Sequence, residues 1–371
     1  MSEGSTIGRH YLSGKPLQIK WSGGIIVSVN DIEECPDDQW LAPGLVDVQV
    51  NGYAGVDFQR DGVELEGLRM AAEGLQRDGC RRWMLTLITD KWEVLLARLK
   101  RFKELRDQSS ELRAAIVGWH VEGPFLSEEP GYRGAHNPEV MQDPSPERMD
   151  ELAAIVAGDP VMVTLAAERP KAIETAKQAI QRGFVVSIGH SNATAEQLRS
   201  AEEVGAKGFT HLGNGMPQEM DRHDNVVCRL FDTEVLMAGV IPDGIHVSPQ
   251  MFRLFHKALP ADRIYYTTDC MSAAGATPGE YTVGHNKLHV GDDQIVRVPG
   301  QSNFAGSALR PLQGVERASE MLSRTWRDVW DIGSINPATL IGLSAGLSIG
   351  DVADICVVRG SETKLDRIEW A

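Results

Sequence analysis

Carboxylate and imidazole side chains follow several short apolar runs of this sequence, and their types are those that bind divalent metal ions. Glu122 ends the run "AAIVGWHVE", His190 follows "FVVSIG", and His211 lies within "GFTHL". A buried carboxylate without a partner costs several kcal/mol, so Glu122 needs a compensating charge. Two neutral imidazoles and one carboxylate suit Zn²⁺ with one position left open for water. We therefore expect a divalent cation near Glu122.

Each of these signals is weak when taken alone. A single histidine at the end of a strand is more often a structural residue than a metal ligand. The combination of Glu122, His190 and His211, with Asp269 following "RIYYTT", is much harder to explain by chance. His120 lies two residues before Glu122 on the same strand face, and we expect it to belong to the core.

The elements that would position these residues alternate along the chain. Amphipathic helical stretches such as "GVELEGLRMAAEGLQRDG" lie between eight short apolar runs, and Thr194 with Gln197 resembles a capping box. Eight strand–helix units predict a (β/α)8 barrel, with a doubly wound sheet as the alternative. In a barrel the carboxyl ends of the strands line the active site. The eight runs are "LVDVQV", "RWMLTLI", "AAIVGWHV", "PVMVTLA", "FVVSIG", "GFTHL", "VLMAGVI" and "RIYYTT".

Both ends of the chain show a strand pattern. The first 40 residues contain "KPLQIKW" and "GGIIVSVN", and the last residues contain "GDVADICVVRG" and "KLDRIEWA". We expect residues 1–42 and 346–371 to form a small β-sandwich domain beside a barrel of residues 43–345.

Composition narrows the possible partners. The 371 residues carry a net charge of −15, which argues against a nucleic-acid binder because phosphate backbones need a basic surface. The five cysteines are scattered, and neither a membrane-spanning apolar run nor a signal-peptide core is present. We therefore expect a soluble cytoplasmic protein that contacts neither nucleic acid nor membrane.

From about Pro43 to Gly350 the sequence resembles the amidohydrolase superfamily, and within it the N-acetylglucosamine-6-phosphate deacetylases. The resemblance implies a (β/α)8 barrel with a small terminal β-domain, a homodimer, and hydrolysis of an N-acetyl amino-sugar phosphate to acetate and the free amine. The segments that carry it are "PGLVDVQVNGYAGVDF", "GWHVEGPFL", "GAHNP", "GHSNAT", "THLGNGM", "DGIHV" and "TTDCMSAAG".

The resemblance also implies roles for individual residues. The metal ligands would be Glu122, His190 and His211, and Asp269 would act first as general base and then as general acid. His136 would polarise the acetyl carbonyl. The substrate would be bound by Ala135, Asn214, Gly215, Arg222 and His246.

The end of the first strand bears on the number of metal ions. Many amidohydrolases bind a second metal through His-x-His at this place, where this chain has Gln49-Val50-Asn51. Amides are poor substitutes for imidazoles, so we expect one ion per subunit. Zn²⁺ is the first candidate, although the same ligands accept Fe²⁺, Mn²⁺ or Co²⁺.

The phosphate site departs most from the family pattern. The family often has Tyr-Asn-Ala-Met where this chain has "GNGM", and Arg-Glu-Pro-Gly where it has "RHDN". Arg222 is retained, and the family places this arginine in the active site of the neighbouring subunit. Two alternatives stay open: an amidohydrolase that deacetylates a different N-acyl amino sugar, with or without a phosphate, and a non-catalytic sugar-phosphate sensor.

Overall fold

The computed structural model describes residues 3–284, 286–297 and 306–371, and its centre is a barrel of eight parallel strands. Neighbouring strands follow one another in chain order, and a parallel bridge between Val50 and Cys270 joins the first strand to the segment after the last one. All eight apolar runs are strands, so the predicted barrel is confirmed. The strands are β5 Leu45–Val50, β8 Cys80–Ile88, β9 Ile116–Glu122, β10 Val161–Leu165, β11 Val185–Ile188, β12 Gly208–Phe209, β13 Met237–Val240 and β14 Ile264–Tyr266.

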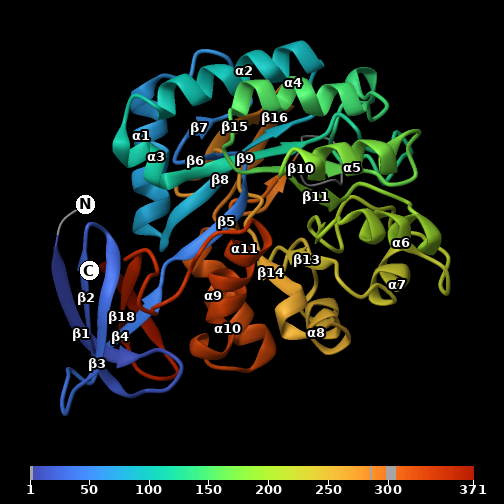
Figure 1. Ribbon diagram of the computed structural model, residues 1–371. Coiled ribbons are helices and arrows are strands. Elements are labelled where there is room, and N and C mark those ends of the chain that lie inside the picture. The colour runs from blue at the N-terminus through green and yellow to red at the C-terminus, as the bar shows by residue number, and fades with distance from the viewer. Residues whose placement is uncertain (1–2, 285, 298–305) are drawn as a thin grey trace.

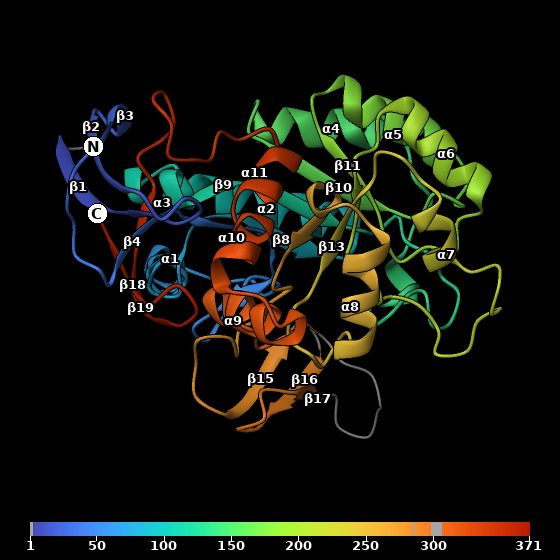
Figure 2. The ribbon, with the colours of Figure 1, turned by 90° about the horizontal axis from the view of Figure 1, so that it is seen from below.

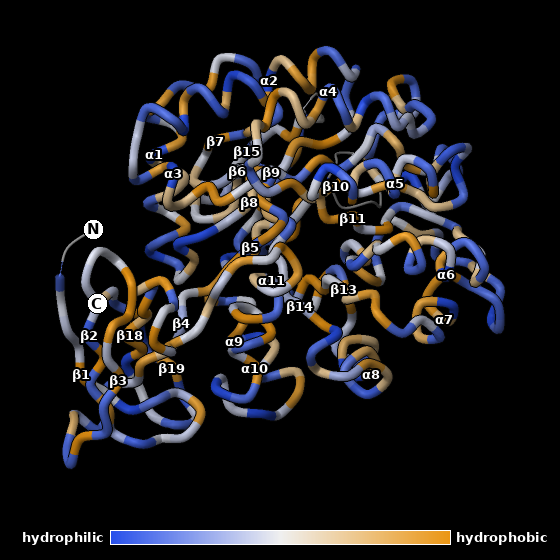
Figure 3. Tube along the Cα trace, viewed as in Figure 1, coloured by the Kyte–Doolittle hydropathy of each residue, from blue (hydrophilic) through white to orange (hydrophobic). Residues whose placement is uncertain are grey.

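Helices surround the barrel (Figure 1), and hydrophobic and hydrophilic residues alternate along them (Figure 3), as expected for helices that cover a core on one side. The expected capping box is present, because Thr194 Oγ1 accepts from Gln197 N and Gln197 Oε1 accepts from Thr194 N. The helices are α1 Leu65–Arg77, α2 Trp92–Arg106, α3 Ser110–Ala115, α4 Pro146–Val156, α5 Ala172–Gln181, α6 Ala195–Val204, α7 Val226–Phe231, α8 Pro249–Ala258, α9 Pro311–Leu322, α10 Trp326–Gly333 and α11 Ile335–Leu340, with 3-10 turns at Pro138–Val140 and Ala261–Arg263.

Both ends of the chain meet in one six-stranded sheet beside the barrel (Figure 1). Its strands, in sheet order, are β19 Leu365–Trp370, β18 Ile355–Gly360, β4 Gln39–Pro43, β1 Gly4–His10, β2 Pro16–Ser22 and β3 Ile25–Asp31. The small domain expected as a β-sandwich is therefore built on a single hydrogen-bonded sheet. The division into residues 1–42 plus 346–371 and residues 43–345 stays a prediction.

A small sheet follows the last barrel strand. Strands β15 Gly279–Val283, β16 Asn286–Val290 and β17 Val296–Arg297 are antiparallel and project from the barrel (Figure 2). The short pair β6 Gly52–Tyr53 and β7 Val56–Asp57 follows the first barrel strand. Among the described residues, none of the helices is long and apolar enough to cross a membrane.

Candidate active site

The backbone turns sharply where three of the expected site residues follow their strands. His190, His211 and Asp269 have φ angles of 49°, 31° and 49°, in the left-handed region that residues with a side chain rarely adopt. Such a conformation costs about 1–3 kcal/mol and persists only where the surrounding structure enforces it. The three residues follow β11, β12 and β14, so the strain is concentrated at the carboxyl ends of the barrel strands.

Glu122, the last residue of β9, is the centre of the site. The residue is 2% exposed, and its Oε1 lies 2.9 Å from His211 Nε2 and 3.5 Å from His190 Nε2. Gln49 Nε2 donates to the same oxygen at 2.9 Å. Burial alone would raise the pKa of Glu122, but the hydrogen bonds from His190 and His211 outweigh burial and hold that pKa well below its usual range. Glu122 is therefore a buried carboxylate anion among imidazoles.

His136 lies in the same cluster, although it comes from a loop and not from a strand end. Ligand atoms of Glu122, His136 and His190 all lie within 4.8 Å of one another. The His136 Nδ1 atom lies 2.8 Å from Thr89 Oγ1, which leaves Nε2 available to the site. Burial, together with the nearby His190, lowers the pKa of His136 to about 3, so its ring is neutral. The structure thus places the residue expected to polarise the acetyl group among possible metal ligands.

The donor set fits a divalent cation. His211 is 3% exposed, and its Nδ1 has no hydrogen-bond partner among the described residues, while its ring centroid lies 4.7 Å from that of His190. Both ion pairs that Glu122 forms within the described ranges are with histidines. One carboxylate with several neutral imidazoles is a donor set of the kind that Zn²⁺ and related ions prefer. Gln49 Nε2 donates to Glu122, and the expected absence of Gln49 from the ligands stays a prediction.

Asp269 follows β14 and is held by Asn51, the residue directly after the first barrel strand. Asn51 Nδ2 donates to its Oδ1 at 2.7 Å, across 218 positions of the sequence. Burial and the negative charge of Glu122 raise the pKa of Asp269 to about 7, in spite of the opposite effects of His211 and His246. A carboxyl group with such a pKa can both accept and donate a proton near neutral pH.

The expected substrate-binding residues lie in loops around this cluster. His246 Nδ1 lies 2.6 Å from Asp243 Oδ2, and Asn214 Nδ2 donates to His211 O. Gly215 lies against the ring of His190. Ala135 and Arg222 are exposed on their loops. The roles of these residues in substrate binding stay predictions.

Sequence reasoning misses several residues that support the site. It identifies Gln49 and Asn51 only as non-ligands, whereas their amides hold Glu122 and Asp269. Thr89 and the carbonyl of Tyr132, which accepts from His190 Nδ1 at 2.8 Å, have no signal in the sequence at all. Asp243 is visible in the sequence as a polar residue after an apolar run, three residues before His246, but its contact with that histidine is not.

His120 is structural, as expected. It is fully buried, and its Nε2 lies 2.8 Å from Thr164 Oγ1. Burial lowers its pKa to about 4, so the ring is neutral inside the barrel.

The fold and the acid-and-imidazole cluster at its strand ends define a barrel of the amidohydrolase class. The chain is 30% identical over 334 residues to the N-acetylglucosamine-6-phosphate deacetylase of Danio rerio, a match that covers 87% of this chain and 81% of the relative. The chain therefore belongs to the N-acetylglucosamine-6-phosphate deacetylase family. A search against protein-family models found no match.

Two further comparisons bear on the sugar. The N-acetylgalactosamine-6-phosphate deacetylase of Escherichia coli O157:H7 is 29% identical over 333 residues, covering 89% of this chain and 86% of the relative. The structure of a mutant N-acetyl-D-glucosamine-6-phosphate deacetylase from Mycobacterium smegmatis, in complex with N-acetyl-D-glucosamine-6-phosphate, superposes with a TM-score of 0.87 at 26% identity. That similarity covers 100% of this chain and 98% of the other.

Proposed function

We propose that the protein hydrolyses the acetamide of N-acetylglucosamine 6-phosphate to glucosamine 6-phosphate and acetate. The observation that supports this most directly is geometric: Glu122 Oε1 lies 2.9 Å from His211 Nε2 and 3.5 Å from His190 Nε2 at the carboxyl ends of the barrel strands. Glu122 is held as an anion among imidazoles, whereas the pKa of Asp269 is about 7. A site that needs one metal-binding carboxylate and one proton carrier requires this difference.

Glu122, His190 and His211 would hold the metal ion, with His136 beside them. A bound divalent ion of this kind supplies Lewis-acid activation of water and of the acetyl carbonyl. We propose one ion per subunit, because the amide of Gln49 already donates to Glu122 at the place where a second metal would need a ligand. Zn²⁺ is the first candidate, ahead of Fe²⁺, Mn²⁺ or Co²⁺.

Asp269 would move the proton. It would take a proton from the attacking water and then give that proton to the leaving amine, so one carboxyl group serves both steps. The hydrogen bond from Asn51 fixes one oxygen of Asp269 and leaves the other for this transfer.

His136 would orient the acetyl group. Because Thr89 occupies its Nδ1, Nε2 is the nitrogen that can face the carbonyl oxygen. One well-placed donor to a developing oxyanion contributes about 3–4 kcal/mol to the lowering of the barrier.

Substrate recognition must be local, because the chain carries a net charge of −15 and cannot attract an anion over a distance. Ala135, Asn214, Gly215 and His246 would contact the sugar phosphate. Arg222, which is exposed on its loop, would reach the neighbouring active site in a homodimer. The free cysteines agree with a cytoplasmic location.

Acetate release from a panel of sugars tests the proposal. The panel contains N-acetylglucosamine, N-acetylgalactosamine and their 6-phosphates, assayed after the metal content of the protein has been measured. We expect the highest kcat/KM on N-acetylglucosamine 6-phosphate. A preference for N-acetylgalactosamine 6-phosphate would replace the proposed substrate with its galactose isomer. A preference for unphosphorylated sugars would favour an amidohydrolase with another substrate, and binding without turnover would indicate a sensor.

A further inference from the structure

A buried carboxylate lies where the barrel closes between its first and last strands. Strands β5 and β14 are the two ends of the eight-stranded sheet, and an isolated parallel bridge joins Val50 to Cys270, which follows β14. Asp47, within β5, is 2% exposed and has no part in the proposed reaction. Its carboxylate contacts the residues just before Asp269, so this acid links the first strand to the segment that carries the proton carrier.

Both carboxylate oxygens of Asp47 accept hydrogen bonds from that segment. Thr267 Oγ1 donates to Oδ1 at 2.6 Å. Thr268 donates to Oδ2 twice, from its Oγ1 at 2.5 Å and from its backbone N at 3.1 Å. The hydroxyl of Thr268 also accepts from Cys270 N at 3.2 Å. This hydroxyl therefore connects Asp47 to the backbone on both sides of Asp269.

Asp269 needs such support because its backbone is strained. Its φ angle of 49° lies in the left-handed region, and an aspartate stays there only where the surrounding structure enforces it. Ser307 N donates to Asp269 O at 2.9 Å, and Asn51 Nδ2 donates to Asp269 Oδ1 at 2.7 Å. Directly before the turn, Thr268 is held by Asp47. A shift of Thr268 would therefore move the carboxyl group of Asp269 relative to Asn51.

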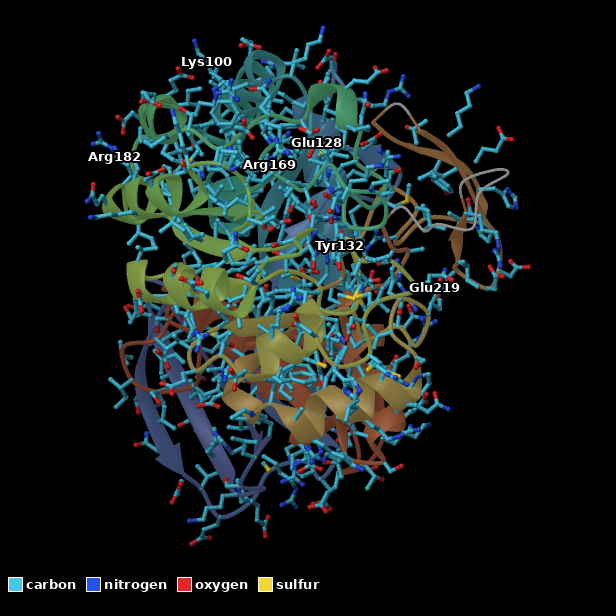
Figure 4. The ribbon with its side chains drawn as sticks, turned by 90° about the vertical axis from the view of Figure 1, so that its right-hand side faces the viewer. Lys100, Glu128, Tyr132, Arg169, Arg182 and Glu219 are labelled. Atoms are coloured by element: carbon cyan, nitrogen blue, oxygen red, sulfur yellow. The ribbon has the colours of Figure 1, made fainter. Side chains whose placement is uncertain are left out.

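Contacts of the loop that covers His190 are more exposed than those of Asp47. The carbonyl of Tyr132 accepts from His190 Nδ1, and Glu128 of the same loop pairs with Arg169 at 2.9 Å. Figure 4 shows Glu128, Tyr132 and Arg169 on the same side of the molecule. The Glu128 side chain is 53% exposed, so water can replace its partner. Asp47 is buried, and the groups bonded to it would stay unpaired if its carboxylate were lost.

We infer that Asp47 is a positioning residue for Asp269, because through Thr268 it holds the left-handed turn that directs the carboxyl group of Asp269 into the site. The inference rests on the proposed function, since it takes Asp269 as the proton carrier. A displacement of about 1 Å at a reacting group can lower turnover by about 10²-fold. Loss of the Asp47 carboxylate should therefore lower kcat and leave KM nearly unchanged.

The kinetics of acetate release separate positioning from a merely structural role. Asp47→Asn keeps the size of the side chain but leaves one acceptor oxygen in place of two. We expect kcat to fall by about 10–10²-fold, with KM within about twofold of the parent value. Asp354→Asn is the matched control, because Asp354 is also a buried carboxylate and is bonded to Arg82. It should lower the unfolding temperature and keep kcat, whereas near-parent kcat in Asp47→Asn would overturn the inference.

A second set of variants tests the same contact without a change of charge. Thr268→Val removes the hydroxyl and should lower kcat as Asp47→Asn does, while Thr268→Ser keeps the hydroxyl and should restore kcat. Thr175→Val is the control, because this buried threonine of α5 has a hydroxyl without a hydrogen-bond partner among the described residues. Parent-like kcat in Thr268→Val would also overturn the inference.

The side-chain amide of Asn51 gives a readout that needs no turnover. Its signal in metal-free protein labelled with nitrogen-15 asparagine, assigned with Asn51→Ser, reports the contact with Asp269. We expect this signal to move in Thr268→Val and to stay in Thr268→Ser and Thr175→Val. A parent protein that releases acetate from none of the sugars would defeat the proposed function alone. An Asn51 signal that stays unchanged in Thr268→Val would overturn the positioning role in either case.

Discussion

At the scale of single residues, the site depends on contacts between side chains that are far apart in the sequence. Asn51 and Asp269 are separated by 218 positions, and Gln49 and Glu122 by 73. The residue types are visible in the sequence because acids and imidazoles stand at the ends of apolar runs. The groups that hold these acids and imidazoles are not visible in the sequence, because an amide, a threonine hydroxyl or a backbone carbonyl is common everywhere in a chain. They are recognised only when the folded barrel brings them into contact.

The left-handed backbone at His190, His211 and Asp269 is equally invisible in the sequence. Glycine reveals such turns most clearly, whereas histidine and aspartate, although enriched among the other residues that adopt them, occur far more often in other conformations. These turns are enforced by the surrounding structure, and they stand where the functional side chains leave the barrel strands. Local strain at a functional site is the usual reason for sequence patterns to fail there.

Replacement of Asp269 tests the assignment of the proton carrier. Asp269→Asn keeps the size of the side chain and a group that can pair with Asn51, but it removes the ability to take up a proton. We expect kcat to fall by at least about 10²–10⁴-fold, with unchanged metal content and unfolding temperature. Near-normal kcat in this variant would mean that another group moves the proton.

At the scale of elements, all eight barrel strands and the capping box of α6 follow from local patterns. Short apolar runs between turns and helices have few other interpretations when they recur eight times. The strand boundaries are predicted less accurately than the strands themselves. Strand β12 is only Gly208–Phe209, although the run "GFTHL" continues to Leu212. The chain leaves the strand early because the left-handed turn at His211 interrupts it.

The capping box of α6 provides a stability test at this scale. Thr194→Ala removes the acceptor for Gln197 N and leaves a helix-terminal donor without its partner. We expect a loss of about 1 kcal/mol in the free energy of unfolding, measured by urea denaturation. Thr194→Ser keeps the hydroxyl and should lose much less, so equal losses in both variants would argue against the cap as the cause.

At the scale of the whole molecule, a buried ion pair joins the terminal segment to the barrel. Arg82 Nε of β8 lies 2.8 Å from Asp354 Oδ2, and these side chains are 8% and 3% exposed. The pair cannot be foreseen from the sequence, because 272 positions separate its members. Pairing of the two terminal segments, in contrast, follows from the strand patterns at both ends.

Removing one member of this pair should destabilise the protein strongly. Asp354→Ala leaves Arg82 buried, with its bond to Ser344 O as the one remaining side-chain hydrogen bond among the described residues, and we expect a loss of about 3 kcal/mol in unfolding free energy. Asp366→Ala is the control, because its pair with Lys364 is exposed on both sides and should contribute within about 0.5 kcal/mol. Similar small losses of unfolding free energy in both variants would show that the Arg82–Asp354 pair does not stabilise the contact between the terminal segment and the barrel.

The proposed homodimer leads to a separate prediction for Arg222, which would bind the phosphate in the neighbouring active site. A forked guanidinium–phosphate contact is specific to the phosphorylated sugar. Arg222→Ala should therefore lower kcat/KM on N-acetylglucosamine 6-phosphate by an amount equivalent to about 2–4 kcal/mol, and leave N-acetylglucosamine nearly unaffected. Arg199→Ala, an exposed arginine on α6, should change neither substrate. Equal losses of kcat/KM on both sugars would show that Arg222 does not recognise the phosphate.

The central claim is that one metal ion, held by Glu122, His190 and His211, makes this barrel a deacetylase. It is tested most directly by adding Zn²⁺ stepwise to metal-free protein while acetate release from N-acetylglucosamine 6-phosphate is measured. We expect no turnover without metal and a linear rise that ends at one equivalent per chain. Turnover in metal-free protein, or a rise that continues to two equivalents, would contradict the claim.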